Sequence, residues 1–222
     1  MLKRFTVMAA IAALSAGVAA AQTQPSDAAY EADLAKRADG VLQVLKLEDQ
    51  AKAVRVREAL IAQYRSLRTL HDARDAKLKQ LPSQDKDGAA KVKGETDQAV
   101  KKLHEEFIAR LDADLTPAQV EQVKDKMTYN VVQVTYNGFC DMIPTLSEAQ
   151  KAYILAQLKE ARELAMDGGS SQEKHAIFGK FKGRINNYLS KEGYDLKKAN
   201  EEWAERRKAR ESGTTTRPAS QS

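Results

Sequence analysis

The strongest constraint on the fold is a stretch from about Glu48 to Leu81, in which no glycine or proline interrupts a helical pattern of apolar residues. The apolar side chains recur every three or four positions, so they share one face of an α-helix. They are Val56, Leu60, Tyr64, Leu67 and Leu70. Pro82 lacks the backbone N–H that a continuing helix needs, so we expect the helix to end there. Such a segment predicts a fold built by packing long helices.

The chain after Pro82 repeats this spacing. Its apolar positions are Val100, Leu103, Phe107, Ile108 and Leu111. The intervening segment 83–98 is polar and punctuated by glycine, which predicts a mobile connector. With a first helix from Tyr30 to Leu45, residues 30–111 are therefore predicted to form a long antiparallel helical hairpin. The abundance of alanine, lysine, glutamate and leucine favours helix throughout.

The first 21 residues have the features of a secretory signal peptide. Lys3 and Arg4 precede an apolar run, and small residues end at Ala21, where we expect cleavage. Residues 22–29 are predicted to be a linker. No second long apolar run follows, so we expect a periplasmic or secreted protein with no stable membrane insertion after cleavage. Removal of the two basic residues lowers the formal net charge from +5 to +3, which is mild and dispersed and argues against nucleic-acid binding.

Two similar motifs open helices in the second half of the chain, LTPAQ at 115–119 and LSEAQ at 146–150. Thr116 and Ser147 are favourable N-cap residues, and Pro117 fits the first position of a helix. Residues 112–211 are therefore predicted to form a compact helical half. Together with the hairpin they give a single all-α domain over 30–211. The tail 212–222 has almost no apolar content and is predicted to be disordered.

One stretch differs from the rest, KMTYNVVQVTYNGFCDMIP at 126–144. Val132, Val134 and Tyr136 alternate with the two-residue period of a strand, and Asn-Gly is typical of a tight turn. We expect an ordered extended segment at about 128–144. Long ordered loops in compact domains are often functional, so this segment is the first candidate for a binding site. Its candidate ligand-binding residues are Tyr129, Asn130, Tyr136 and Asn137.

A second candidate segment is HAIFGKFKGRINNYL at 175–189. Gly179 and Gly183 fall on one helix face, which predicts that another backbone packs closely there. The polar residues Arg184, Asn186 and Asn187 lie beside Tyr188. Amides can satisfy hydroxyl groups and an aromatic ring can cover the apolar face of a sugar, so these four residues join the candidate site. We expect the two Tyr/Asn-rich segments to meet at one groove.

The sequence has none of the standard catalytic or phosphate-binding motifs. His71, His104 and His175 are far apart, and we interpret each as a surface or core histidine. No metal or cofactor is predicted. Cys140 has no second cysteine to pair with and is interpreted as a small buried apolar residue. Hydrolysis by paired carboxylates remains an alternative, since it depends on distances in space rather than in sequence.

Two resemblances bear on function. The strings KMTYNVVQVTYNGFCDMIPTLSEAQKAYI and ARELAMDGGSSQEKHAIFGKFKGRINNYLSKEGYDLKKANEEW resemble an exported bacterial family catalogued as domain of unknown function 3826. The resemblance runs from Leu115 to Arg207 and more loosely back to Tyr30. It implies an exported sugar-binding protein and supplies no defined site residues. LTPAQ and LSEAQ are also similar to the Leu-Thr-x-x-Gln motif of Spy and CpxP periplasmic proteins, which implies an all-helical chaperone.

The residues and the resemblances together favour an exported, non-catalytic binding or accessory protein. Its expected partner is a carbohydrate or another exported protein. The first alternative is a Spy/CpxP-like periplasmic chaperone or envelope-stress protein. The extended segment at 128–144 has no counterpart in that pattern and argues against this alternative. The second alternative is an uncharacterised hydrolase.

Overall fold

The computed structural model describes residues 27–214, and every regular element in this range is an α-helix, as the all-α prediction requires. The helices are α1 (Asp27–Leu45), α2 (Gln50–Gln80), α3 (Lys86–Asp114), α4 (Pro117–Met127), α5 (Val131–Met142), α6 (Glu148–Met166), α7 (Ser171–Lys191) and α8 (Leu196–Thr214). None of the helices within 27–214 combines the length and the apolar character that crossing a membrane requires.

The predicted signal peptide, 1–21, lies outside the described residues. Within the predicted linker, helix α1 already begins at Asp27. At the other end α8 continues to Thr214, three residues into the segment predicted as a disordered tail. Residues 215–222 of that segment lie outside the described part of the chain.

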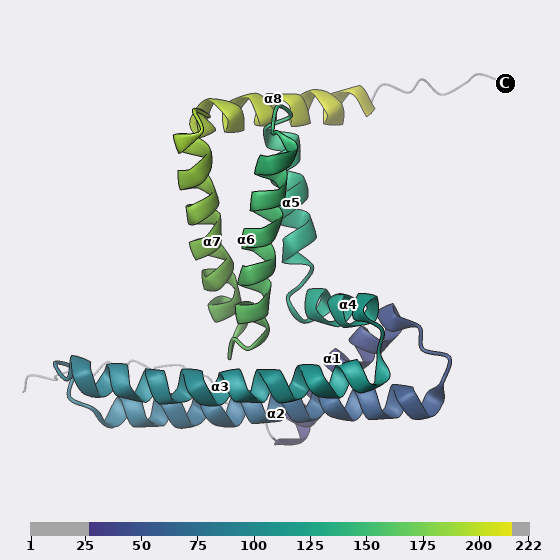
Figure 1. Ribbon diagram of the computed structural model, residues 1–222, viewed down its shortest axis with the longest axis vertical. Coiled ribbons are helices and arrows are strands. Elements are labelled where there is room, and N and C mark those ends of the chain that lie inside the picture. The colour runs from purple at the N-terminus through teal and green to yellow at the C-terminus, as the bar shows by residue number, and fades with distance from the viewer. Residues whose placement is uncertain (1–26, 215–222) are drawn as a thin grey trace, which may run out of the picture.

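The helices form two groups set across each other (Figure 1). Helices α2 and α3 run antiparallel as a long pair, which confirms the predicted hairpin, and α1 and α4 pack against them. Helices α5, α6 and α7 stand across this pair, and α8 lies across their far ends (Figure 1). Helix α6 packs against both α5 and α7.

Each group has its own core. The first core joins residues of α1, α2, α3 and α4, and its most buried members include Val56, Leu60, Leu111 and Val123. The second joins α5, α6 and α7, around Ile154, Leu158, Phe178, Ile185 and Leu189. Met166, the last residue of α6, is fully buried in the first core. Because α4 belongs to the first core, the change from one group to the other falls at the turn after Met127.

The prediction of an extended segment at 128–144 is wrong, because residues 131–142 form helix α5. Val132 and Phe139 are buried on one face, with Tyr136 partly buried between them, and this is helical spacing. Val134, which the strand interpretation placed on the same face as Val132, is 68% exposed. The alternation of valines was therefore coincidental, and the wider spacing to Phe139 decides the conformation.

The predicted helix starts are confirmed. Thr116 and Ser147 each form a capping box, in which the side chain accepts from the N–H three residues on and the glutamine there accepts from the cap N–H. The prediction of a mobile connector at 83–98 is wrong, because a similar cap starts a helix within it and residues 86–98 are helical. The carboxylate of Asp85 accepts from the N–H of Gly88 at 2.8 Å, so α3 begins at Lys86.

The far end of the hairpin is not covered by other helices (Figure 1). The buried residues of α2 end at Leu67, and those of α3 begin at Phe107. Between these positions His71, Arg74 and His104 still contact Asp167 and the start of α7, but further along the hairpin α2 and α3 pack against each other. Their apolar side chains there, such as Leu78 and Val92, are half-buried in the seam between the helices.

Candidate functional site

Two of the predicted binding residues, Tyr129 and Asn130, form the turn between α4 and α5. Both have left-handed backbone conformations, with φ of 59° for Tyr129 and 55° for Asn130. Asparagine tolerates this region, whereas a tyrosine there is uncommon. The N–H of Asn130 donates to the carbonyl of Asp125 at 2.8 Å, which closes the end of α4 and holds the turn. Backbone strain of this kind is concentrated at functional sites.

This turn forms one wall of a cavity of about 510 Å³, which we call the Tyr129 pocket. The other walls come from α1, α2, α4 and the beginning of α7. The lining residues are Asp33, Lys36, Arg37, Gly40, Val41, Tyr64, Lys126, Met127, Tyr129, Asn130 and Lys174. Ligand pockets in proteins have volumes of roughly 300–1,000 Å³, so this cavity has room for a small ligand.

Two aromatic rings line the Tyr129 pocket. Tyr129 is 51% exposed as a residue, and its ring stacks on His175 with ring centres 5.9 Å apart. Tyr64 is half-buried, and burial raises the pKa of its hydroxyl to about 12, so it stays a neutral donor at physiological pH. The guanidinium of Arg37 lies 5.8 Å from the centre of the Tyr64 ring. The pocket therefore combines an accessible aromatic face with polar groups.

Lys174 is the buried polar residue of this pocket. Only 7% of it is exposed, and its ammonium group donates to the carbonyls of Met127 and Met166, each at 3.1 Å. These carbonyls are at the C-terminal ends of α4 and α6, where a cation is favoured. Burial, opposed by the charge of Asp167 and aided by that of Arg37, lowers the pKa of Lys174 to about 8. The lysine thus ties together three helices at the base of the pocket.

The remaining predicted site residues lie elsewhere. On α5, Tyr136 is half-buried, and the exposed Asn137 accepts a hydrogen bond from Gln133 at 2.7 Å. Because α6 lies between α5 and α7 (Figure 1), the two predicted segments do not meet at one groove along these helices. Tyr129 does reach α7, but at His175 near its start.

The four predicted site residues on α7 begin at Arg184, nine residues after His175. Arg184 forms an ion pair with Glu160 at 3.7 Å, and Tyr188 packs against Tyr153 with ring centres 4.0 Å apart. Asn186 and Asn187 are exposed. None of these four candidates lines the Tyr129 pocket. Their role in ligand binding stays a prediction.

The expected close packing at Gly179 and Gly183 is wrong. A side chain added at either position would meet no atom within 4 Å. Both glycines lie on the exposed side of α7, so no other described backbone approaches them. Their helical spacing had been the only basis for that prediction.

A second hollow, the His104 cleft, has a volume of about 780 Å³ and lies between the hairpin and helices α6 and α7. At its base the Nδ1–H of His104 donates to the carboxylate of Asp167 at 2.7 Å. The Gln63 amide also donates to this carboxylate, at 3.3 Å. The hydrogen bond to Asp167 raises the pKa of His104, against the effect of burial, and Glu163 also raises it. The cleft therefore contains a histidine oriented by a buried carboxylate.

His71 is held by hydrogen bonds to Arg74 and to Asp167, the residue that follows α6. Arg74 donates to its Nδ1 at 3.0 Å, and since arginine has no acceptor, the ring proton must be on Nε2. That proton is donated to the carbonyl of Asp167 at 2.7 Å. Sequence reasoning missed this convergence, because His71, His104 and Asp167 come from three separate segments. Within 27–214, no group of three His, Cys, Asp or Glu side chains is placed to hold a metal ion.

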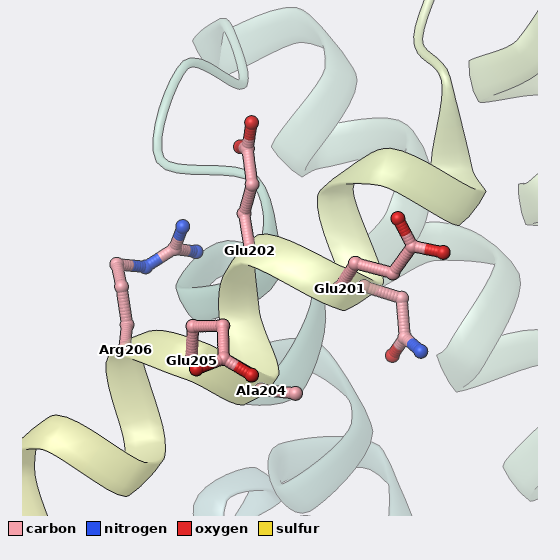
Figure 2. Close-up of a pocket in the computed structure, with 6 residues that line it drawn as sticks. Glu201, Glu202, Ala204, Glu205 and Arg206 are labelled. Atoms are coloured by element: carbon pink, nitrogen blue, oxygen red, sulfur yellow. The ribbon is translucent and has the colours of Figure 1, made fainter.

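A third hollow, on α8, is shallow and acidic. Figure 2 shows Glu201, Glu202 and Glu205 along this helix, where all three are exposed. Arg206 donates instead to the carbonyls of Asp141 and Met142, at 2.9 and 3.0 Å, and so caps the end of α5. These glutamates form a solvated surface rather than a site.

The fold and its two main hollows define an all-α protein with ligand-sized cavities at the junction of two helical groups. The sequence matches the family model described as Protein of unknown function (DUF3826) over residues 31–209, and the chain belongs to that family. No curated protein matches the sequence significantly.

Proposed function

We propose that this protein is an exported, non-catalytic binding module that holds a carbohydrate in the Tyr129 pocket. One observation carries the proposal: a half-exposed aromatic ring and a neighbouring amide are held in a strained turn at the edge of a ligand-sized cavity. A structural turn could use glycine at these positions without strain. Retaining tyrosine and asparagine there fits a role for their side chains.

The chemistry of the pocket suits a polyhydroxylated ligand. The flat face of Tyr129 can cover the apolar face of a sugar ring. The Asn130 amide offers both donors and an acceptor to hydroxyl groups, and the protonated hydroxyl of Tyr64 adds a donor within the cavity.

Calorimetric titration with a panel of oligosaccharides tests this proposal. We expect Tyr129→Ala to weaken the binding of any ligand found by about tenfold, since stacking on one aromatic ring contributes about 1–3 kcal/mol for nucleic-acid bases and we expect a similar effect for a sugar ring. Asn130→Gly keeps the left-handed turn and removes only the amide, so it should weaken binding without loss of stability. Val134→Ala, an exposed position outside the pocket, serves as the control. Absence of binding across a broad panel contradicts the proposal.

Export is the second element of the proposal and has its own test. Expression of the full chain in a bacterial host followed by osmotic shock should release a protein whose first residue is Gln22. Retention of an uncleaved chain in the cytoplasm contradicts export. It leaves the carbohydrate titration unaffected, since that uses purified protein.

A second candidate function is hydrolysis, favoured by the His104–Asp167 pair. The pairing fixes the His104 ring with Nδ1 protonated and leaves Nε2 beside the open cleft, 3.7 Å from Glu163. An oriented histidine of this kind can transfer protons. A substrate screen that compares the wild type with His104→Gln tests it, and equal turnover by both proteins argues against this function. The chaperone alternative has less support, since the large exposed apolar side chains among residues 27–214 are spread over separate helices and the α4–α5 turn.

A further inference from the structure

We infer that the Tyr129 pocket selects a negatively charged carbohydrate, one that carries a carboxylate or sulfate group, over its neutral counterpart. This inference rests on the proposed function and concerns the same site. It depends on the charges that line the pocket, on their lack of counter-ions, and on the environment of Lys174.

The pocket has more cations than carboxylates. Its lining includes four cationic side chains, Lys36, Arg37, Lys126 and Lys174, and one carboxylate, Asp33. Asp33 is already engaged with Arg37 in an ion pair of 2.7 Å.

The three lysines make no ion pair with any residue in the described range 27–214. Elsewhere the chain pairs its buried cations. Arg162, for example, contacts the carboxylates of both Glu121 and Asp125 within 2.8 Å. The pocket therefore keeps an unneutralised positive charge that an anionic ligand would complement.

The charge excess is local to this pocket. The larger His104 cleft is lined by three permanent cations, Arg74, Lys101 and Lys180, and by four carboxylates. Protonation of His104 brings that cleft close to neutrality. The mild positive charge of the whole chain would favour both hollows alike, so it does not account for the difference.

Lys174 provides an independent indication. Two of its three N–H groups are used by the carbonyls of Met127 and Met166, and no described carboxylate forms an ion pair with it. Its third N–H is left for the pocket that it lines. Burial is the main cause that lowers its pKa to about 8, and the charge of Asp167 offsets only part of this effect. An anion bound in the pocket would favour the charged form and raise this pKa, so binding near pH 8 should take up protons.

Titration calorimetry with three matched trisaccharides tests the inference: oligogalacturonate, a sulfated galactose oligomer and neutral galactotriose. At low salt we expect the better of the two anionic ligands to bind at least about tenfold more tightly than the neutral one, and the ratio should shrink in about 0.5 M NaCl as screening increases. The two anionic arms distinguish carboxylate from sulfate. Titrations at pH 8 in buffers of different ionisation enthalpy should show net proton uptake.

The double variant Lys36→Met/Lys126→Met removes two exposed pocket cations and should preserve the fold. It should reduce the preference for the anionic ligand by about fivefold or more, because anionic binding loses much more affinity than neutral binding does. Lys197→Met, an exposed lysine on α8, is the control. Equal affinity for neutral and anionic trisaccharides overturns the inference but keeps the proposed function. Failure of all three to bind overturns the inference, and the proposed function is overturned as well when the broad oligosaccharide panel also fails to bind.

Discussion

The Tyr129 pocket and the His104 cleft both include residues from the first turn of α7, yet their buried charged groups have opposite surroundings. In the pocket, Lys174 is surrounded by backbone carbonyls and has no counter-ion. In the cleft, Asp167 is paired with His104, a ring that can accept a proton. Dipoles orient a charge without cancelling it, whereas an ion pair neutralises it. The difference shows that two residues seven positions apart, Asp167 at the end of α6 and Lys174 in α7, can belong to a nearly neutral cleft and to an electropositive pocket.

The largest effect is expected for Lys174→Met. Methionine has similar length but cannot donate, so the carbonyls of Met127 and Met166 would lose this partner. We expect the free energy of unfolding to fall by about 2–3 kcal/mol, measured by urea denaturation at pH 7. Lys126→Met, in the same pocket but exposed, should change it by less than about 0.5 kcal/mol. A small effect at Lys174 would show that the carbonyls do not depend on it.

A smaller effect is expected for Asp167→Asn. The substitution keeps the shape but removes the charge that attracts His104, and we expect a loss of about 1–2 kcal/mol. NMR titration of the His104 ring should show its pKa fall towards the ordinary value, because Asp167 is the main cause of its increase. An unchanged His104 pKa would mean that Glu163 dominates instead.

The two sites should also give opposite responses to pH. The pKa of His104 is raised above 6.5 in the folded protein, so its contribution to stability is complete below 6.5 and is lost as pH rises through the folded-state pKa. The pKa of Lys174 is lowered from 10.5 to about 8, so the folded state binds fewer protons between these values and stability rises with pH there.

Thermal unfolding measured from pH 5 to 10.5 checks this pair of responses. We expect His104→Gln to remove the decrease that begins above pH 6.5, and Lys174→Met to remove the recovery above about 8. If either variant abolishes both responses, the two sites are coupled and the comparison above fails.

The smallest effect is expected for Asn130→Gly. Glycine adopts a φ of 55° without strain, while asparagine tolerates it at a small cost. We expect a gain of a few tenths of a kcal/mol in unfolding free energy, offset in part by the greater freedom of glycine when unfolded. Gly193→Ala, at a φ of 94°, should change stability in the opposite direction. Destabilisation by Asn130→Gly would show that the amide supports the turn.

Local signals predicted much of the fold. The caps at Thr116 and Ser147 and the apolar stripe of α2 depend on residues a few positions apart, so the sequence displays them directly. Helix α5 was missed because the spacing of its valines is compatible with both a strand and a helix. Only the burial of Phe139 together with Val132 shows that the spacing is helical. Asp85 is a favourable N-cap residue, but the glycines that follow it led us to predict a connector instead of a helix start.

The sites were less predictable, because their members come from separate helices. Tyr129 and Asn130 were identified as a polar pair, but Tyr64 and Lys174, which complete their pocket, lie 65 and 45 residues away from Tyr129 in the sequence. Likewise nothing near His104 in sequence indicates Asp167, which is 63 residues away. His104 and Asp167 come together only when the turn between α6 and α7 packs against the hairpin.

The uncovered far end of the hairpin has a practical consequence. Residues 78–94 line neither the pocket nor the cleft, and their side chains touch neither core. Extra turns inserted symmetrically into both helices there would lengthen the molecule while leaving its ligand chemistry in place. The same segment is a suitable attachment point for a fluorophore or an affinity tag.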